Sequence, residues 1–367
     1  VASPGAAHGG DSRLQNLVAT VLLSWGWRAN GLALFAGAIV ALALPPLDLW
    51  FFAFFGFTFF ALLLDGAAAD ANLTTAGRRF RRGFVRGWCF GLGYFIGGLW
   101  WVSSSLLVDG GLLLIAVPFA TVLLPMGLAA FTGLGGGLAL ILWRDGPQRL
   151  FALAFSLGLS EFLRGHLLTG FPWNLFGVAA MPDPIFMQSA SVFGTYGVTF
   201  LAIFVFSVPV LWLRLEVRPP RLANGLVTAL AVALIATNTG YGLHRLANAT
   251  VSEHPAVTIR VVQPNIEQYD KWLAGRGLDH LDTLLELSDR ATSPQTIGAE
   301  SFTHIIWPET ALPFVLTQNA EAIAAIAAVV PEDTLLLAGA VRKEPPATPQ
   351  SVARYYNSVY ALNGSAE

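Results

Sequence analysis

Seven long apolar runs in the first 245 residues limit the fold of this chain more than any other feature of its sequence. They span approximately residues 29–45, 49–64, 84–104, 112–142, 150–168, 185–213 and 222–242. A helix needs about 20 apolar residues to cross the hydrocarbon core of a bilayer. Only 12% of the 367 residues are charged, which is about half the usual share in a soluble domain. We therefore expect a membrane α-helical bundle of about seven helices at 29–245, preceded by a cytoplasmic or interfacial segment at 1–28.

Positively charged residues occur in every second loop between these runs. Arginine is present in the loops at 65–87, 143–149 and 214–221, whereas neither lysine nor arginine is present at 46–48, 105–111 and 169–184. Loops with an excess of arginine remain on the cytoplasmic side of a membrane. The alternation therefore predicts a multi-pass protein whose residues after about 245 lie on the outer side of the membrane.

From residue 246 the sequence has the pattern of an α/β domain. Residues 1–245 contain 14 Lys and Arg against 9 Asp and Glu, whereas residues 246–367 contain 7 against 14. Short β-branched or apolar runs alternate there with segments of helical periodicity. The strands are predicted at 256–262, 304–307, 334–341 and 356–362, the helices at 278–290 and 320–330, and a surface loop at 342–352. This order favours a mixed or parallel sheet with helices packed on it.

Glu309 is the clearest candidate for chemistry, because it directly follows the predicted strand at 304–307. Active sites of α/β sheets form at the ends of strands. The apolar residues on both sides of Glu309 predict a site with little water, in which a carboxylate serves well as a general base. The alternative is a solvated glutamate that caps the next turn.

Two further candidates lie in the loop after the first predicted strand. Asn265 either orients a substrate or satisfies backbone groups of the loop. Trp272 stands in a polar, acidic stretch, where a tryptophan contacts lipid, lines a cleft or packs as a lid.

A third group of candidates lies in the fifth apolar run. Glu161 and Arg164 are three residues apart, so they share a helix face and can pair. Ionisable groups within a membrane are costly and often functional, but Arg164 could also extend to lipid headgroups from the end of the helix. Trp173 follows in an aromatic turn, which either anchors the chain at the interface or forms a rim that faces the outer domain.

The single cysteine, Cys89, excludes a disulfide within these residues. It lies in an apolar run, where a thiol is unreactive. The sequence has no spacing of zinc ligands and no glycine motif for phosphates or dinucleotides. We expect no metal, no organic cofactor and no nucleic acid partner.

Four segments together resemble the apolipoprotein N-acyltransferases. The fifth run and its loop carry EFLRG at 161–165 and LTGFPW at 168–173, and the outer domain begins with VQPNIEQ at 262–268. The segment IWPETA at 306–311 resembles the catalytic glutamate segment of that family, and YNSV at 356–359 resembles the strand that follows it. Trp-Pro-Glu alone is typical of the wider nitrilase superfamily.

The resemblance implies a membrane helical bundle with a periplasmic nitrilase-like domain at 246–367, a partial αββα sandwich, in a bacterial inner membrane. It also implies an acyl transfer from a phospholipid to the amino group of the diacylglyceryl-cysteine of an apolipoprotein. The intermediate is a thioester on a cysteine of a Glu–Lys–Cys triad. No cofactor is implied, and a monomer is expected.

Residue by residue, the resemblance implies that Glu309 is the general base. Trp173 and Trp272 match aromatic positions at the mouth of the active site, where Asn265 would also bind substrate, and Glu161 with Arg164 matches a polar pair of the membrane part. The family's lysine follows the YNSV strand, so Lys343 does not match it, and 246–367 contain no cysteine. We therefore expect the sequence to be truncated before its catalytic Lys and Cys, and to be inactive as it stands.

Three other interpretations remain open. The chain could be a membrane-tethered nitrilase-type amidase that acts through Glu309 on a soluble substrate. It could be a transporter or lipid-binding protein whose outer domain only binds. It could also be a non-catalytic, truncated paralogue of the acyltransferases.

Overall fold

The computed structural model describes residues 9–109, 114–115, 117–213, 221–250, 252–271, 273, 275–346, 348 and 351–365. The chain divides into two units, Val1–Ala249 and Thr250–Glu367, and each is described by itself. Trp272 and residues 214–220 of the predicted arginine loop at 214–221 lie outside the described residues.

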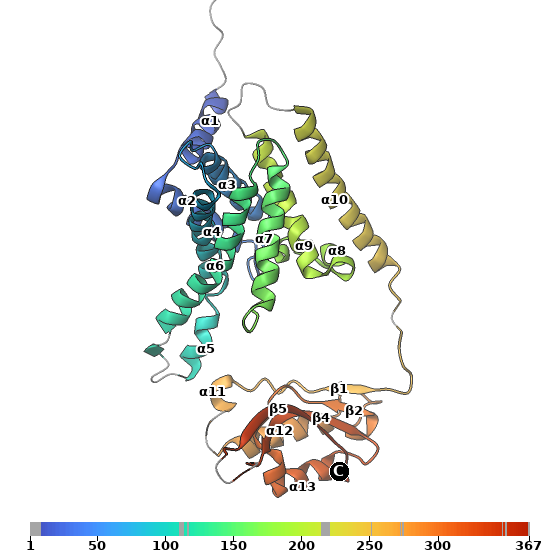
Figure 1. Ribbon diagram of the computed structural model, residues 1–367. Coiled ribbons are helices and arrows are strands. Elements are labelled where there is room, and N and C mark those ends of the chain that lie inside the picture. Colours follow the sequence, from blue (N-terminus) through green and yellow to red (C-terminus); the bar gives the residue numbers. More distant parts are fainter. Residues whose placement is uncertain are drawn as a thin grey trace, which may run out of the picture. The chain divides into compact units, whose positions relative to one another are not determined.

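In the described residues of the first unit, the regular elements are helices joined by loops (Figure 1). Its elements are α1 (Gly9–Leu22), α2 (Gly26–Ala41), α3 (Phe52–Ala68), α4 (Ala76–Gly98), α5 (Val102–Asp109), α6 (Val117–Leu142), α7 (Arg149–His166), η2 (Phe176–Ala180), α8 (Pro184–Met187), α9 (Ala190–Ser207), η3 (Val208–Trp212) and α10 (Arg221–Ala247). Helices α2, α3, α4, α6, α7, α9 and α10 lie in the seven apolar runs, whereas a membrane bundle of about seven helices stays a prediction. Among the described residues, three segments are long and apolar enough to cross a membrane: α6, α9 with η3, and α10.

Glycine allows α4 and α6 to approach closely. A Cβ atom on Gly83 would lie 2.3 Å from the carbonyl oxygen of Gly136, and one on Gly87 would lie 2.5 Å from that of Thr132. Small residues at such contacts let two backbones meet, which is the usual way in which helices associate in membranes. Helices α4 and α6 are therefore closely packed against each other.

The second unit is a five-stranded sheet with helices (Figure 1). Its elements are β1 (Ile259–Val261), α11 (Gln268–Lys271), α12 (Gly277–Asp289), η4 (Ala299–Ser301), β2 (His304–Ile306), β3 (Leu312–Val315), η5 (Leu316–Gln318), α13 (Ala320–Val329), β4 (Leu335–Glu344) and β5 (Arg354–Leu362). Strands β1, β2, β4 and β3 pair in parallel in that order, and β5 pairs antiparallel with β4.

The four predicted strands and two predicted helices are all present. The short strand β3 was not predicted, because it contains Pro313, which cannot donate a ladder hydrogen bond. The predicted surface loop is shorter than expected, since β4 continues to Glu344 and β5 begins at Arg354.

One face of the sheet forms the core of this unit. Ile305 and Leu336 point from β2 and β4 to this face, where they belong to one buried cluster with Leu284 of α12 and Ile326 of α13. The opposite face is more open, and Val261 and Val359 are 72% and 73% exposed there. The sheet of the described residues therefore has helices on one side only.

Candidate functional site

The loop that carries Glu309 is fixed to β4 on both sides. The backbone N–H of Trp307 donates to the carbonyl oxygen of Leu337 at 2.9 Å, and that of Ala311 donates to Gly339 at 2.7 Å. The Trp307 side chain is buried, and its Nε1 donates to Ser288 Oγ at 2.9 Å. Glu309 is therefore held at the carboxyl end of a parallel strand, where α/β sheets place their ligand sites.

Gly339 makes this arrangement possible. A Cβ atom at residue 339 would lie 2.6 Å from the carbonyl oxygen of Pro308 and 2.8 Å from the Cα atom of Glu309. Both neighbours are backbone atoms, so a side chain at this position would push the loop away from β4. The adjacent Thr310 has a φ of 48°, an unusual conformation for a β-branched residue that the surrounding contacts must hold in place.

The side chain of Glu309 is exposed, contrary to the expectation of an apolar, water-poor site. The reason is that the apolar residues beside it in the sequence point into the core, where Trp307, Ala311 and Leu312 are buried. Asn357 of β5 donates from Nδ2 to Glu309 Oε1 at 2.5 Å. The second carboxylate oxygen has no hydrogen-bond partner among the residues that the structure describes, so it remains available for a further contact.

Lys271, at the end of α11, contacts this loop with its side chain. Its Nζ donates to the backbone carbonyl oxygen of Glu309 at 3.3 Å. Partial burial lowers the pKa of Lys271, and the charge of Glu309 acts in the opposite direction. Lys271 also lines a cavity of about 330 Å³, whose other walls include Leu278, Pro313 and Phe314.

Asn265 is not part of this group in the described contacts. It is exposed, with a φ of 51° in the loop after β1, a conformation that asparagine tolerates better than most residues. Neither of the two residues that contact Glu309 was predicted as a site residue. Asn357 lies 48 residues away and is brought to Glu309 by the β4–β5 register, and Lys271 reaches the loop from α11.

Glu161 and Arg164 form a fully buried ion pair on α7. The two side chains are 1% and 0% exposed. Arg164 Nε donates to Glu161 Oε1 at 3.1 Å and Nη2 donates to Oε2 at 3.0 Å, which is the bidentate geometry of strong arginine–carboxylate pairs. Arg164 therefore does not extend to the surface, as one interpretation of the sequence allowed.

The remaining bonds of this pair hold the loop after α7. Arg164 Nη1 donates to the carbonyl oxygens of Phe171 at 2.5 Å and Trp173 at 2.8 Å. Glu161 Oε2 also accepts the backbone N–H of Phe176 at 3.1 Å. The ion pair thus satisfies backbone groups that the loop leaves without partners.

Trp173 lies at the tip of this loop and is 50% exposed. Its ring stacks on Trp101, with centroids 4.8 Å apart and an interplanar angle of 21°. The next residue, Asn174, donates from Nδ2 to the carbonyl oxygen of Gly98 at 2.7 Å and accepts from the Tyr94 hydroxyl at 3.2 Å. Tyr94 and Asn174 support the loop, and neither was predicted as a site residue.

The predicted site residues therefore form two groups in two units: Glu161, Arg164 and Trp173 in the first, and Glu309 in the second. Among the described residues, no group of three or more His, Cys, Asp or Glu could hold a metal ion. Cys89 is buried in α4.

Comparisons with known proteins agree with the motifs of both groups. Residues 36–208 match the family model described as the apolipoprotein N-acyltransferase N-terminal domain. Proteins named apolipoprotein N-acyltransferase are similar over nearly the whole chain. The one from Rhizobium leguminosarum bv. trifolii is 43% identical over 96% of this chain, the one from Rhodopseudomonas palustris is 39% identical over 95%, and the one from Brucella suis biovar 1 is 40% identical over 95%. The chain spans 64–65% of the length of these relatives. By its sequence, the chain belongs to the apolipoprotein N-acyltransferase family.

Proposed function

We propose that the protein transfers an acyl chain from a phospholipid to the amino group of the N-terminal diacylglyceryl-cysteine of an apolipoprotein. The observation that carries this proposal is the Trp307–Glu309 loop, which presents an exposed carboxylate at the end of a parallel strand. The relatives that share this sequence at 39–43% identity are named for the same activity.

The proposed reaction proceeds through a thioester. Glu309 accepts the proton of a cysteine thiol, and the thiolate attacks an ester carbonyl of the phospholipid. The ester C–O bond breaks, the lysophospholipid leaves with the proton from Glu309, and the acyl chain stays on sulfur. The apolipoprotein amine then attacks the thioester, loses a proton and releases the thiol. Residues 246–367 contain no cysteine, and we place the nucleophilic cysteine and the catalytic lysine in the part of the relatives' length that this sequence does not span.

The other predicted residues have supporting roles in this proposal. The buried pair of Glu161 and Arg164 positions the turn that carries Trp173, and Trp173 contributes to the mouth of the active site. Asn265 and Trp272 bind substrate from the loop after β1. Lys271 helps to fix the glutamate loop through the carbonyl oxygen of Glu309.

We further propose a seven-helix bundle in a bacterial inner membrane, with α2, α3, α4 and α7 crossing beside the three longer apolar segments. The arginine loops then lie in the cytoplasm and the second unit lies in the periplasm. In the full-length protein, the open face of the sheet packs in an αββα sandwich. The protein acts as a monomer on membrane lipids.

The test is acyl transfer by membranes that contain the full-length protein, with phosphatidylethanolamine and a diacylglyceryl peptide as substrates. Glu309→Gln removes the base without changing the shape of the side chain. We expect the rate to fall about a hundredfold or more. The matched control is Glu300→Gln, because Glu300 is an exposed glutamate of the same unit.

Mass spectrometry of the peptide detects the third acyl chain directly. Normal transfer by the Glu309→Gln protein would contradict the role of Glu309. Hydrolysis of soluble amides without any acyl transfer by the unaltered protein would favour the amidase interpretation. No reaction of either kind would favour a non-catalytic paralogue.

A further inference from the structure

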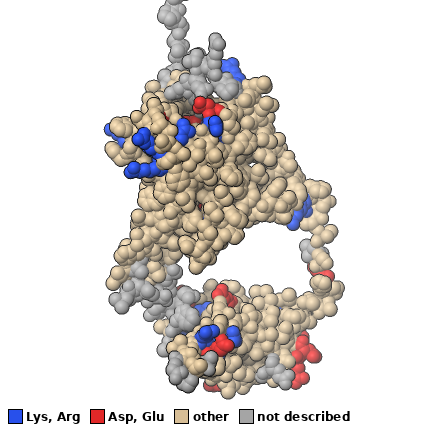
Figure 2. All heavy atoms as spheres, in the orientation of Figure 1, with Lys and Arg blue, Asp and Glu red and all other residues tan. Residues whose placement is uncertain are grey.

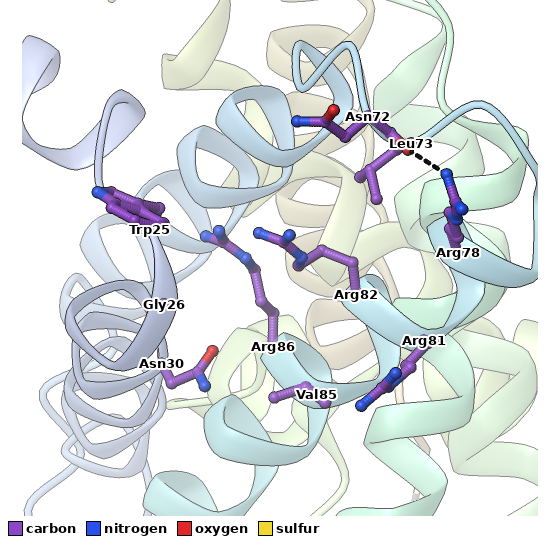
Figure 3. A pocket seen from close by; sticks show the side chains of 10 residues that line it. All are labelled: Trp25, Gly26, Asn30, Asn72, Leu73, Arg78, Arg81, Arg82, Val85 and Arg86. Carbon is purple, nitrogen blue, oxygen red and sulfur yellow. Dashed lines mark hydrogen bonds between the residues drawn. The ribbon is translucent and has the colours of Figure 1, made fainter.

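A second candidate site lies in the first unit, far along the chain from Glu309. A cavity of about 610 Å³ opens between the start of α2, the α3–α4 loop and the first turns of α4 (Figure 3). It is lined by Trp25, Gly26, Asn30, Asn72, Leu73, Arg78, Arg81, Arg82, Val85 and Arg86. None of the residues proposed for acyl transfer contributes to it.

The arginines come from one helix and share one side of it. Arg78, Arg82 and Arg86 are spaced by four residues in α4, so their side chains project from adjacent turns of the same face. In Figure 3 the side chains of Arg82 and Arg86 both point toward Trp25, into the space in front of α2. Figure 2 shows Lys and Arg atoms gathered at one end of the first unit.

Arg86 lines the cavity and has a donor without a partner. It is 2% exposed, and its Nη1 donates to the carbonyl oxygen of Leu63 at 3.1 Å. Its buried Nε has no hydrogen-bond partner among the described residues. A buried charge without a full set of partners lowers the stability of the folded protein. An anion bound in the cavity would therefore stabilise the protein.

The protein neutralises this cluster only in part. Arg82 is 3.4 Å from Asp70, and this is the ion pair that the described residues provide to the four cavity arginines. Arg78 donates instead to the backbone carbonyl oxygen of Asn72, at 3.3 Å. The cavity therefore carries a net positive charge that matches a phosphate group.

A helix also begins at the cavity, because α2 starts at Gly26, one of the lining residues. The N-cap residue of α2, Trp25, makes no side-chain hydrogen bond to the helix, and a Cβ atom on Gly26 would meet nothing within 4 Å. Free N–H groups at a helix start bind anions, which adds to the attraction of the arginines.

The apolar surroundings indicate where the anion comes from. Trp25 and Trp27 are each 79% exposed, and Leu23 is 78% exposed. Tryptophans in such positions lie at the level of lipid headgroups, and basic pockets between membrane helices bind anionic headgroups. The phosphate group of a phospholipid would pair with the arginines, and its acyl chains would contact the exposed tryptophans.

We propose that this cavity is a binding site for the phosphate group of an anionic membrane phospholipid. Arg82 and Arg86 contact the phosphate, Arg78 and Arg81 lie at its edge, and the acyl chains run along the exposed apolar residues at the start of α2. The site is separate from acyl transfer and does not depend on it.

The test is native mass spectrometry of the detergent-solubilised full-length protein with phosphatidylglycerol, with phosphatidylcholine of the same acyl chains, and with inorganic phosphate. We expect one molecule of phosphatidylglycerol to bind at least about tenfold more tightly than phosphatidylcholine. Arg82→Gln should abolish this preference, and Arg86→Gln should do the same if that protein folds. The control is Arg144→Gln, which removes an exposed arginine from another loop.

Each outcome decides the proposal. The proposal is supported if the Arg144→Gln protein still prefers phosphatidylglycerol and the Arg82→Gln protein does not. Loss of this preference in the double variant Arg78→Gln/Arg81→Gln would support it as well. Equal binding of the two lipids, or equal loss in the control, would overturn it. If inorganic phosphate binds as tightly as the lipid and displaces it, the cavity is a site for soluble anions. That result would overturn the lipid assignment.

Discussion

The two candidate glutamates of this protein differ in how fully their hydrogen-bonding capacity is used. Glu161 is buried, and its two oxygens accept bonds from Arg164 and from the backbone of Phe176. Glu309 is exposed, and one oxygen accepts a bond from Asn357. A carboxylate with all its positions occupied can stabilise a loop, whereas one with a free oxygen on a rigid loop can take up a proton.

This difference predicts opposite consequences for the two residues. Loss of Glu161 should reduce stability and affect activity only through the loop that it supports. Loss of Glu309 should remove activity and leave stability almost unchanged, because exposed side chains contribute little to folding. The following variants test that contrast.

The largest expected effect on stability is that of Glu161→Ala. The substitution leaves the Arg164 charge buried without its carboxylate, which costs about 3–5 kcal/mol. We expect a clear fall in the thermal unfolding midpoint of the protein in detergent. Asp145→Asn, at an exposed position of the same unit, is the control and should leave the midpoint unchanged.

The double variant Glu161→Met/Arg164→Met sharpens this test. Both buried charges are then absent, so part of the lost stability should return. The carbonyl oxygens of Phe171 and Trp173 still lack their donor, so the loop should become sensitive to limited proteolysis. A double variant with a resistant loop would contradict the role of Arg164 as its support.

Gly339→Ala should have a smaller effect on stability and a clear effect on activity. The new Cβ would stand 2.6 Å from the Pro308 carbonyl oxygen, and overpacking of this kind costs about 1–3 kcal/mol. Since the strain falls on the loop of Glu309, acyl transfer should decrease more than stability does. The control is Gly240→Ala in α10, where a Cβ meets nothing within 4 Å. Equal losses of activity in both proteins would contradict this prediction.

Local sequence patterns predicted the elements well, for physical reasons. A long apolar run has few alternatives to a helix, and Thr75 and Asn319 supply the side-chain caps that begin α4 and α13. The short strand β3 escaped prediction because Pro313 weakens the strand pattern. Its position is determined by pairing with β4, which no local pattern contains.

The contacts of the candidate sites were less predictable than the elements. The pairing of Val341 with Asn357 in the β4–β5 ladder determines that Asn357 reaches Glu309. In the loop after α7, Arg164 donates to backbone carbonyl oxygens. Every residue has such an oxygen, so the sequence does not indicate which ones Arg164 contacts. Their convergence depends on unusual backbone angles, such as the φ of 51° at Asn174.

The smallest expected effect concerns Lys271, one of two lysines in the chain. Burial lowers its pKa in the folded protein, and the charge of Glu309 opposes this shift. Between the lower pKa of the folded protein and the higher pKa of the unfolded chain, the unfolded chain binds more protons than the folded protein does. The contribution of Lys271 to stability therefore rises as the pH rises through the folded pKa. This contribution is small because the side chain is only partly buried.

The fraction of Lys271 in the neutral amine form is easier to measure than the contribution of Lys271 to stability. Lys271 should react with an acylating reagent at lower pH in the folded protein than in urea. Glu309→Gln should move this reaction to still lower pH, because it removes the charge that favours the ammonium form. Peptide mass spectrometry distinguishes Lys271 from Lys343, and identical profiles with and without Glu309 would mean that the two side chains do not interact in solution.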